Sequence, residues 1–382
     1  MKIRLIKPYV GKEELENIKE VFDRTWLGRG PKVEEFEKTW SKYLDCKNSV
    51  ALNSGTAALH LALWAYKFPK GKKVLVPAMT FVSTANAALY NNLIPVFVDV
   101  KEETLQMDLD DLERKYDEDC VAVIPVHFGG HPVPMDKLMP WAGERNLKVI
   151  SDCAHCAGGQ YKGKKLGTWA DIGCFSFEEK KYLATGDGGM VSSNNQELME
   201  KIRGNCQVGM SSRTWQRFKD VKDSRKADAF HWYYEVKDLG YKYNMNDITA
   251  AIGLAQLKKL DYMNRRRAEI LKKYLEGIKD CKNIKPAFPY DLTTTYYDFM
   301  LRIKNKKREE FIINMQEKGI STGVHTMPLT LHPLYKNYSA DISMALRIWD
   351  EYVILPFYVD LSDEEIQYVI DAIISFDKQQ NN

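Results

Sequence analysis

Short apolar runs alternate with amphipathic stretches between about residues 47 and 195. Seven short β-branched or apolar runs cover residues 49–53, 74–77, 94–100, 121–126, 149–152, 173–177 and 189–192. Strands that are apolar on both faces occur in sheets covered by helices on both sides. The pattern therefore predicts an α/β domain.

The pattern becomes helical and more polar after about residue 195. Apolar residues recur near the 3.6-residue period over 247–260, which predicts an amphipathic helix, and a basic helix is expected from about 262. We expect a large domain over 1–260, with an N-terminal arm over 1–35, and a small α+β domain over 261–382. The charged segment 219–228 lacks periodicity and is predicted to be an exposed loop.

Composition narrows the class of protein. The chain has 382 residues, 45% hydrophobic and 28% charged, and its net charge of +3 is too small to predict a nucleic-acid partner. No apolar run reaches the ~18 residues of a membrane span, and the first twenty residues resemble no targeting peptide. We therefore expect a cytoplasmic protein with no membrane partner. Cys153 and Cys156 form a CxxC, but buried small residues are a better interpretation than a metal site.

Two groups of residues suggest cofactor chemistry. Ser54, Gly55 and Thr56 follow an apolar strand and precede a helix, where free N–H groups favour an anion such as phosphate. An ordinary N-cap is the alternative. Asp152 ends another strand, where α/β sheets bind ligands, although Asp is also a common turn residue.

A pair of lysines completes the set. Lys180 and Lys181 lie in an apolar, glycine-rich stretch, and either is a candidate for a partly desolvated amine that forms a Schiff base; a solvated charge pair is the alternative. A phosphate site, an acid at a strand end and an amine are together the groups that hold pyridoxal 5′-phosphate. Spacing alone does not choose between the two lysines.

At these residues the sequence resembles the DegT/DnrJ/EryC1/StrS family of sugar aminotransferases. The shared blocks extend from the turn at 26–31 through 53–59, 151–157 and 175–189 to 355–356. The resemblance implies the fold of type I pyridoxal-phosphate enzymes, with a mixed, mostly parallel seven-stranded sheet. It also implies that Lys181 forms the internal aldimine and that Asp152 pairs with the ring nitrogen of the cofactor.

The remaining site residues follow from the resemblance as well. It implies phosphate contacts from Ser54, Gly55, Thr56 and Ser176, a stacking contact from Phe81, and a place for His155 near the phenolic oxygen. The segment with Lys242 and Asn244 is implied to reach the phosphate of a partner subunit in a homodimer. Trp26, Arg29 and His325 are implied to contact the substrate. Glu178 and Glu179 depart from the family pattern, as does Arg29.

The implied reaction moves an amino group from glutamate to a keto-sugar nucleotide in two half-reactions. Lys181 would be the acid and base, and Asp152 would keep the ring protonated. The alternatives are an aminotransferase for a small phosphorylated ketone such as dihydroxyacetone phosphate, a dehydratase in which His replaces the lysine, and a regulator that binds the cofactor without turnover. A nicotinamide oxidoreductase is disfavoured because no GxGxxG follows an early strand.

Overall fold

The computed structural model describes residues 1–210, 235–236, 238–338 and 340–380. A seven-stranded sheet forms the centre of the large lobe, with strand order β1-β9-β8-β5-β4-β2-β3. Its strands are β1 (Asn48–Leu52), β2 (Lys73–Pro77), β3 (Ile94–Val98), β4 (Cys120–Val123), β5 (Lys148–Asp152), β8 (Ile172–Ser176) and β9 (Gly189–Ser193). Five neighbouring strands are parallel, and β9 is antiparallel to both β1 and β8. The expected mixed sheet is confirmed.

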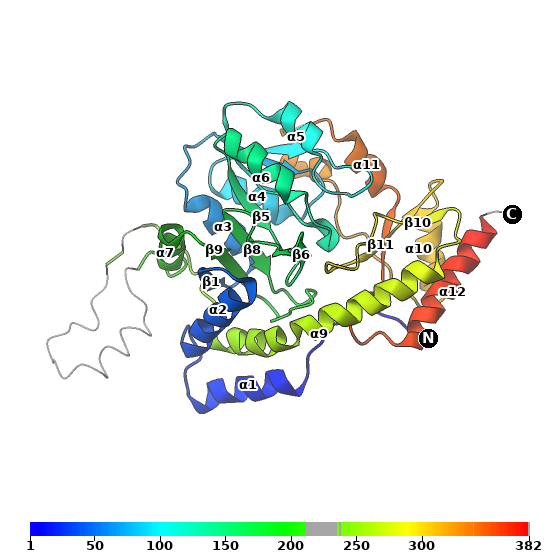
Figure 1. Ribbon diagram of the computed structural model, residues 1–382, viewed down its shortest axis with the longest axis horizontal. Helices are drawn as coiled ribbons and strands as arrows, with labels where there is room; N and C mark the ends of the chain where they lie inside the picture. Colours follow the sequence, from blue (N-terminus) through cyan, green and yellow to red (C-terminus); the bar gives the residue numbers. More distant parts are fainter. Residues whose placement is uncertain (211–234, 237, 339, 381–382) are drawn as a thin grey trace.

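Helices cover both faces of this sheet (Figure 1). They are α1 (Lys12–Asp23), α2 (Pro31–Leu44), α3 (Gly55–Trp64), α4 (Val82–Tyr90), α5 (Leu109–Lys115), α6 (Met135–Glu144) and α7 (Gln196–Asn205). Helix α3 packs on β5, β8 and β9, whereas α5 and α6 pack on β3 and β5. The strands are almost wholly buried because both faces are covered, which explains their unbroken apolar sequences.

The small lobe contains a three-stranded antiparallel sheet of β10 (Ile284–Pro286), β11 (Phe299–Ile303) and β12 (Tyr352–Leu355). Helices α10 (Arg308–Glu317) and α12 (Asp363–Gln379) accompany it, and α11 (Ser343–Trp349) precedes β12. Short elements complete the fold: η1 (Phe128–Gly130), β6 (Gln160–Tyr161), β7 (Lys164–Lys165), η2 (Leu329–Leu331) and η3 (Pro333–Tyr335). The α+β composition expected for this region is present.

One long helix connects the two lobes. Helix α9 (Asp247–Gly277) is continuous across residue 260, where the sequence predicted a domain boundary between two helices. Leu260, Met263 and Arg267 are all buried on one side of it, so the apolar period continues through this point. Figure 1 shows α9 running beneath the sheet and onward beside α12. The division at 260 stays a prediction.

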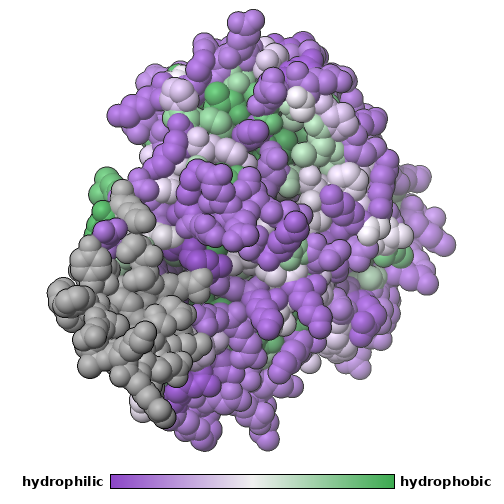
Figure 2. Space-filling model, turned by 60° about the vertical axis from the view of Figure 1, so that its left-hand side comes forward, coloured by the Kyte–Doolittle hydropathy of each residue, from purple (hydrophilic) through white to green (hydrophobic). Residues whose placement is uncertain are grey.

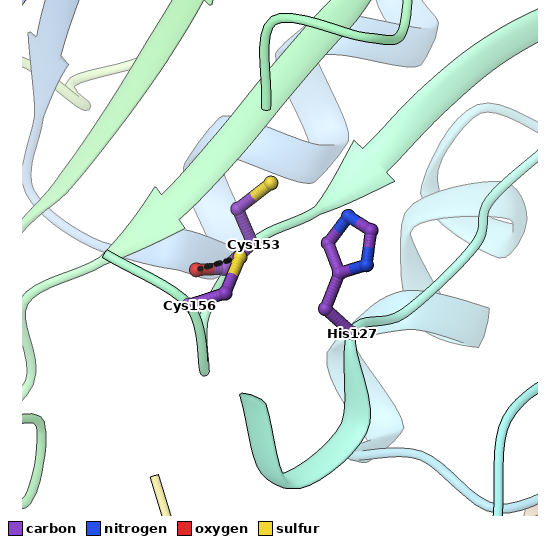
Figure 3. Close-up of side chains that lie close together, drawn as sticks. All are labelled: His127, Cys153 and Cys156. Atoms are coloured by element: carbon purple, nitrogen blue, oxygen red, sulfur yellow. Dashed lines mark hydrogen bonds between the residues drawn. The ribbon is translucent and has the colours of Figure 1, made fainter. Parts of the chain in front are cut away.

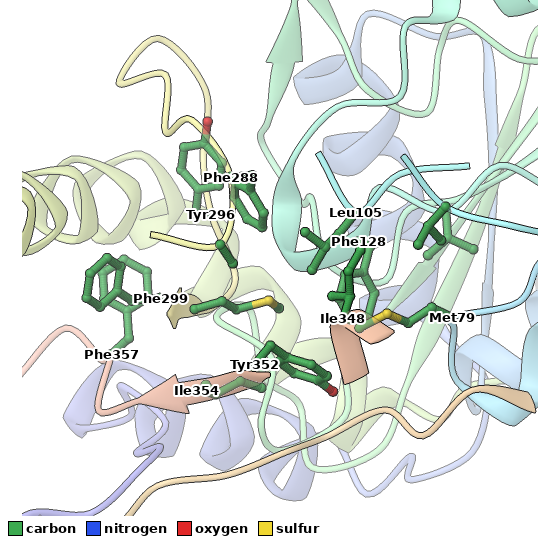
Figure 4. Packing of buried hydrophobic residues seen from close by; sticks show 14 of the residues in the cluster. Met79, Leu105, Phe128, Phe288, Tyr296, Phe299, Ile348, Tyr352, Ile354 and Phe357 are labelled. Atoms are coloured by element: carbon green, nitrogen blue, oxygen red, sulfur yellow. The ribbon is translucent and has the colours of Figure 1, made fainter. Parts of the chain in front are cut away.

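The two lobes share one apolar core. Phe128 and Met79 of the large lobe belong to the same buried cluster as Tyr352 and Ile348 of the small lobe, and Figure 4 shows these side chains between the lobes. This shared packing fixes the lobes against each other. The outer face in Figure 2 is predominantly hydrophilic. Among the described residues, no helix has the length and apolar character needed to cross a membrane. The predicted loop at 219–228 lies outside the described residues.

Candidate active site

The candidate site lies where two central strands end. Asp152 is the last residue of β5 and Ser176 the last of β8, and the two strands are parallel neighbours. Helices α3 and α4 begin at the same edge of the sheet, since Thr56 Oγ1 lies 2.7 Å from Ser83 Oγ and Thr84 contacts Asp152. Four elements from different parts of the sequence thus converge, as the elements of open α/β sheets do at the ligand crevice.

Asp152 is held in a fixed orientation. The Thr84 hydroxyl donates to its Oδ2 at 2.9 Å, and the Ala154 N–H donates to its Oδ1 at 3.1 Å. Its side chain is buried, and this desolvation raises the pKa of the carboxyl, while the two hydrogen bonds and the Lys181 charge oppose the shift. A buried, oriented carboxylate is suited to a cationic partner at the crevice.

The start of α3 forms a cradle beside Ser176. The Ser54 hydroxyl accepts the Ala57 N–H at 3.1 Å, so Ser54 is the N-cap that the alternative interpretation predicted. A Cβ at Gly55 would lie only 2.8 Å from the Ser176 Cβ, and one at Gly189 only 2.3 Å from the Ser54 oxygen. Glycine is needed at both positions for this close approach. The cap leaves the N–H groups of the first helical turn directed at one point, where the helix dipole favours an anion.

Phe81 presents an exposed aromatic ring at the start of α4. Phe81 is the N-cap residue of α4 and its side chain is 64% exposed, which is unusual for a phenylalanine. Helix α4 also supplies Thr84, the partner of Asp152. A planar ligand paired with Asp152 would find this ring close by.

Lys181 lies in the loop that follows β8. Its N–H donates to the Glu178 carbonyl at 2.8 Å, and its Nζ lies 4.3 Å from the centre of the Tyr297 ring. Burial lowers the pKa of the amine, while the carboxylates of Asp298 and Asp152 raise it. A desolvated amine between two carboxylates has the environment that a Schiff-base lysine requires.

The residues that precede Lys181 in the loop differ from it in exposure and hydrogen bonding. Lys180 and Glu179 are exposed. Glu178 accepts the Lys180 N–H through Oε2 at 3.0 Å, so its carboxylate serves the loop backbone. Lys181 is therefore the better shielded of the two lysines.

His155 is a neutral imidazole stacked against the small lobe. Its ring stacks on Tyr297 at 4.2 Å between centroids and 13° between planes, and its Nδ1 accepts the Gly129 N–H at 3.3 Å. Burial and the nearby charge of Lys181 lower its pKa well below the usual value. Because Nδ1 is an acceptor, Nε2 carries the proton and is a hydrogen-bond donor.

The small-lobe side of the site was not predicted from the sequence. Tyr297 contacts both Lys181 and His155, and Asp298 is a buried carboxylate next to it. Arg267 of α9 donates to the Tyr296 and Tyr297 carbonyls at 3.2 and 2.6 Å. The one usable feature in the sequence was an acid directly before the apolar strand 299–303.

The CxxC lies behind Asp152. The ligand atoms of His127, Cys153 and Cys156 lie within 4.8 Å of one another, and all three residues are buried (Figure 3). Burial raises the pKa of Cys153, but hydrogen bonds from Cys156 and His127 lower it to about 6. His127 Nδ1 accepts the Val133 N–H at 3.1 Å and Nε2 contacts Ser151 Oγ at 2.9 Å. Both ring nitrogens are thus engaged, which favours a brace for the end of β5 over a metal site.

The N-terminal turn requires a correction. Arg29 was expected to contact the substrate, but it is buried and forms an ion pair with Glu37 at 2.6 Å. Glu37 also pairs with Arg203 at 2.6 Å, so the guanidinium of Arg29 is committed to a structural network. Trp26 donates through Nε1 to the Arg29 carbonyl at 3.1 Å and stabilises the turn. We therefore remove Arg29 from the substrate-binding set.

Three other predicted residues lie near the edges of the site. His325 is exposed at the surface of the site. Desolvation lowers the pKa of its ring, and the nearby charges of Lys181 and Lys180 lower it further. Lys242 is exposed and its Nζ donates to Asn244 Oδ1 at 2.8 Å. The backbone of this segment accepts the Asn53 N–H at 2.7 Å, next to the cradle.

Comparison with known proteins gives the family. The model of the DegT/DnrJ/EryC1/StrS aminotransferase family matches residues 8–374. The chain belongs to this family. It is 37% identical to the spore coat polysaccharide biosynthesis protein SpsC of Bacillus subtilis over 96% of this chain and 95% of that protein. It is 32% identical to the GDP-perosamine synthase of Escherichia coli O157:H7 over 98% of both chains.

Solved structures of aminotransferases have the same fold. TlmJ from Streptoalloteichus hindustanus, an aminotransferase, superimposes with a TM-score of 0.90 and 29% identity over the full length of both chains. The sugar aminotransferase Spr1654 of Streptococcus pneumoniae, described as putative, matches in its PLP form with a TM-score of 0.89 and 27% identity, covering 99% of each chain. The fold and family implied by the sequence motifs are confirmed.

Proposed function

We propose that this aminotransferase uses pyridoxal 5′-phosphate to move an amino group from L-glutamate to the keto group of a nucleotide-linked sugar. The observation that carries the proposal is the convergence of a buried carboxylate, Asp152, and a desolvated amine, Lys181, at one edge of the sheet beside an anion cradle. The PLP and PMP forms of Spr1654 support the cofactor. GDP-perosamine synthase and the pseudoaminic acid enzyme PseC of Helicobacter pylori support a sugar as substrate.

The residues present fit this cofactor. The free N–H groups at the start of α3, with the hydroxyls of Thr56 and Ser176 beside them, suit a phosphate group. Asp152 offers the ring nitrogen an oriented countercharge, and the exposed Phe81 offers the ring an apolar face. Bound pyridoxal phosphate supplies an electron-poor ring that stabilises negative charge on the substrate carbon.

Each protein group then has a defined task. Lys181 binds the cofactor through its amine and, when released, moves a proton between two carbon positions. Asp152 supplies the negative charge that keeps the ring nitrogen protonated. His155 would be the hydrogen-bond donor to an oxygen of the ring, through Nε2, because its Nδ1 is occupied by the Gly129 N–H.

The substrate and partner assignments extend this proposal. We assign His325 and Trp26 to the sugar side of the site. We assign Lys242 and Asn244 to the phosphate, where the exposed amine of Lys242 supplies positive charge. Contribution of this segment to the site of a second subunit would make the homodimer the active form.

A substrate screen tests the proposal. The holoenzyme is incubated with L-glutamate and a set of 3-keto and 4-keto nucleotide sugars, with dihydroxyacetone phosphate as the contrasting acceptor. We expect 2-oxoglutarate together with an amino sugar nucleotide, both measured by mass spectrometry. Amination of dihydroxyacetone phosphate alone would contradict the proposed substrate class, and a cofactor band that glutamate does not change would contradict transamination.

A further inference from the structure

A second carboxylate faces Lys181 from the small lobe. Asp298 precedes β11, and its side chain is 3% exposed. Its neighbour Tyr297 provides the ring over which the Lys181 Nζ lies, at 4.3 Å from the centroid. The chain bends at Tyr297, and the charges of Asp298 and Lys181 act directly on each other.

The Asp298 carboxylate has no hydrogen bond or ion pair within the part of the chain that the structure describes. Its backbone carbonyl alone accepts a hydrogen bond, from the Tyr290 hydroxyl at 3.4 Å. A buried carboxylate without partners is costly and needs a compensating charge. Its cationic neighbours are Lys181 and Arg267.

Within the described chain, Arg267 forms no hydrogen bond with the Asp298 carboxylate and is held by other acceptors. Its Nε and Nη2 donate to the Tyr296 and Tyr297 carbonyls, so its guanidinium holds the backbone that carries Asp298. Arg267 is itself buried. Of the two neighbouring cations, Lys181 is the one whose flexible side chain is not held by these carbonyls. Its amine is therefore the partner for the Asp298 carboxylate.

We propose that Asp298 is a positioning residue that stabilises the ammonium form of Lys181 and so makes its amine a stronger base at the reacting carbon. This proposal rests on the proposed function, in which Lys181 moves a proton during catalysis. Burial disfavours the ammonium form, and a carboxylate in the same low-dielectric environment restores it. The proton taken from the substrate carbon then stays on Lys181, ready for delivery to the second carbon.

The electrostatic surroundings support this assignment. Burial lowers the pKa of Lys181, and Asp298 is the largest of the charges that raise it, ahead of Asp152 and Glu178. Burial in turn raises the pKa of Asp298 to about 7, opposed by Lys181 and Arg267. The other titratable groups that feel the Asp298 charge are tyrosines, namely Tyr290, Tyr297 and Tyr352.

The first experiment uses the protein without cofactor. Wild type and Asp298→Asn are labelled with trace acetic anhydride over a pH series, and modification of Lys181 relative to the adjacent Lys180 is measured by peptide mass spectrometry. Loss of the carboxylate lowers the pKa of Lys181, so a larger fraction is free amine. We expect at least threefold more Lys181 labelling near pH 8, with Lys180 unchanged.

Three further variants make this experiment decisive. Asp377 is a buried acid of the same lobe that accepts the Lys282 and Asn283 N–H groups at 2.9 and 2.8 Å, so Asp377→Asn controls for general loosening. Asp298→Glu keeps the charge and should restore the wild-type profile. Asp298→Ser also removes the charge, so it should change Lys181 labelling in the same way if Asp298→Asn does not fold. Identical Lys181 profiles in wild type and a folded neutral variant would overturn the proposal.

The second experiment uses the holoenzyme with glutamate deuterated at Cα. Slower proton removal in Asp298→Asn should lower kcat about 10- to 100-fold and raise the primary isotope effect, with a much smaller change in KM. An unchanged isotope effect and kcat would overturn the role in proton transfer. Failure of the wild type to bind cofactor at Lys181 would instead overturn the proposed function, and the labelling result would be unaffected.

Discussion

The two walls of the site are built in different ways. The large-lobe wall consists of residues at strand ends and helix starts, such as Asp152 and Ser176, each fixed by main-chain geometry or hydrogen bonds. The small-lobe wall consists of Tyr297 and Asp298 before an antiparallel strand, together with Arg267 from a long helix. The carboxylate of the first wall has two hydrogen-bond donors, whereas that of the second has none within the described chain.

This difference separates two tasks. A carboxylate held by two donors is suited to a permanent partner, the ring nitrogen of the cofactor. A carboxylate without donors is suited to a partner whose charge changes during the reaction, the amine of Lys181. The predictions below test this separation.

The largest effect is expected at Lys181. Lys181→Ala should lower turnover by about 10⁴-fold, since it removes the acid and base of the reaction. Lys180→Ala is the matched control and should retain turnover within a few fold, because Lys180 is exposed. Steady-state assays of both variants measure this. The reverse ranking would show that the two lysines have been assigned in the wrong order.

The second effect concerns the large-lobe wall. Asp152→Asn should lower kcat about 10²- to 10³-fold, because the electrostatic partner of the ring is lost. Thr84→Val removes one donor to this carboxylate and should cost about tenfold, in line with a hydrogen bond to a charged group. Spectra of the bound cofactor and kcat report both changes. Equal effects of the two substitutions would contradict the role of Thr84 as support for Asp152.

The third effect is on stability and concerns the small-lobe wall. The pKa of Asp298 is about 7 in the folded protein and roughly 4 in the unfolded chain. The folded state thus binds more protons between these values, so this group makes stability fall as pH rises from about 4 to 7. Asp298→Asn removes this pH-dependent loss of folding stability, which is at most about 4 kcal/mol. Urea unfolding should show the variant gaining on wild type between pH 5 and 8, and a constant difference would contradict the assignment.

The smallest effect is expected at Phe81. Replacing this exposed ring by Leu keeps an apolar side chain but removes the aromatic face, which is worth about 0.5–1.5 kcal/mol in ring pairs. Cofactor affinity should fall a few fold, measured by fluorescence titration of the cofactor-free protein. Leu331→Ala, at another exposed apolar residue, serves as the control and should bind as wild type does. No difference between the two variants would exclude stacking on Phe81.

Much of the large lobe could be predicted because its chemistry follows from local sequence. Buried parallel strands are continuous apolar runs, and the residue that ends such a strand lies at the ligand edge of the sheet. Asp152 and the Ser54 cap were identified in this way. The continuity of α9 was missed, although no Pro or Gly separates the two predicted helices near residue 260.

The small-lobe wall could not be predicted in the same way. Tyr297 and Asp298 reach Lys181 only through the shared core between the lobes, and that packing has no local sequence pattern. The prediction for Arg29 was wrong for a related reason. Its partner Glu37 lies eight residues away, and Arg203, which shares Glu37, lies much further along the chain. Pairings of this kind depend on tertiary structure.

The most direct test of the account is to find the atom that binds the cofactor. The protein is loaded with pyridoxal phosphate, treated with sodium borohydride to fix the bond, digested and sequenced by mass spectrometry. We predict a single pyridoxyl group on Lys181. A label on Lys180, or on no lysine of the loop after β8, would contradict the assignment on which the mechanism depends.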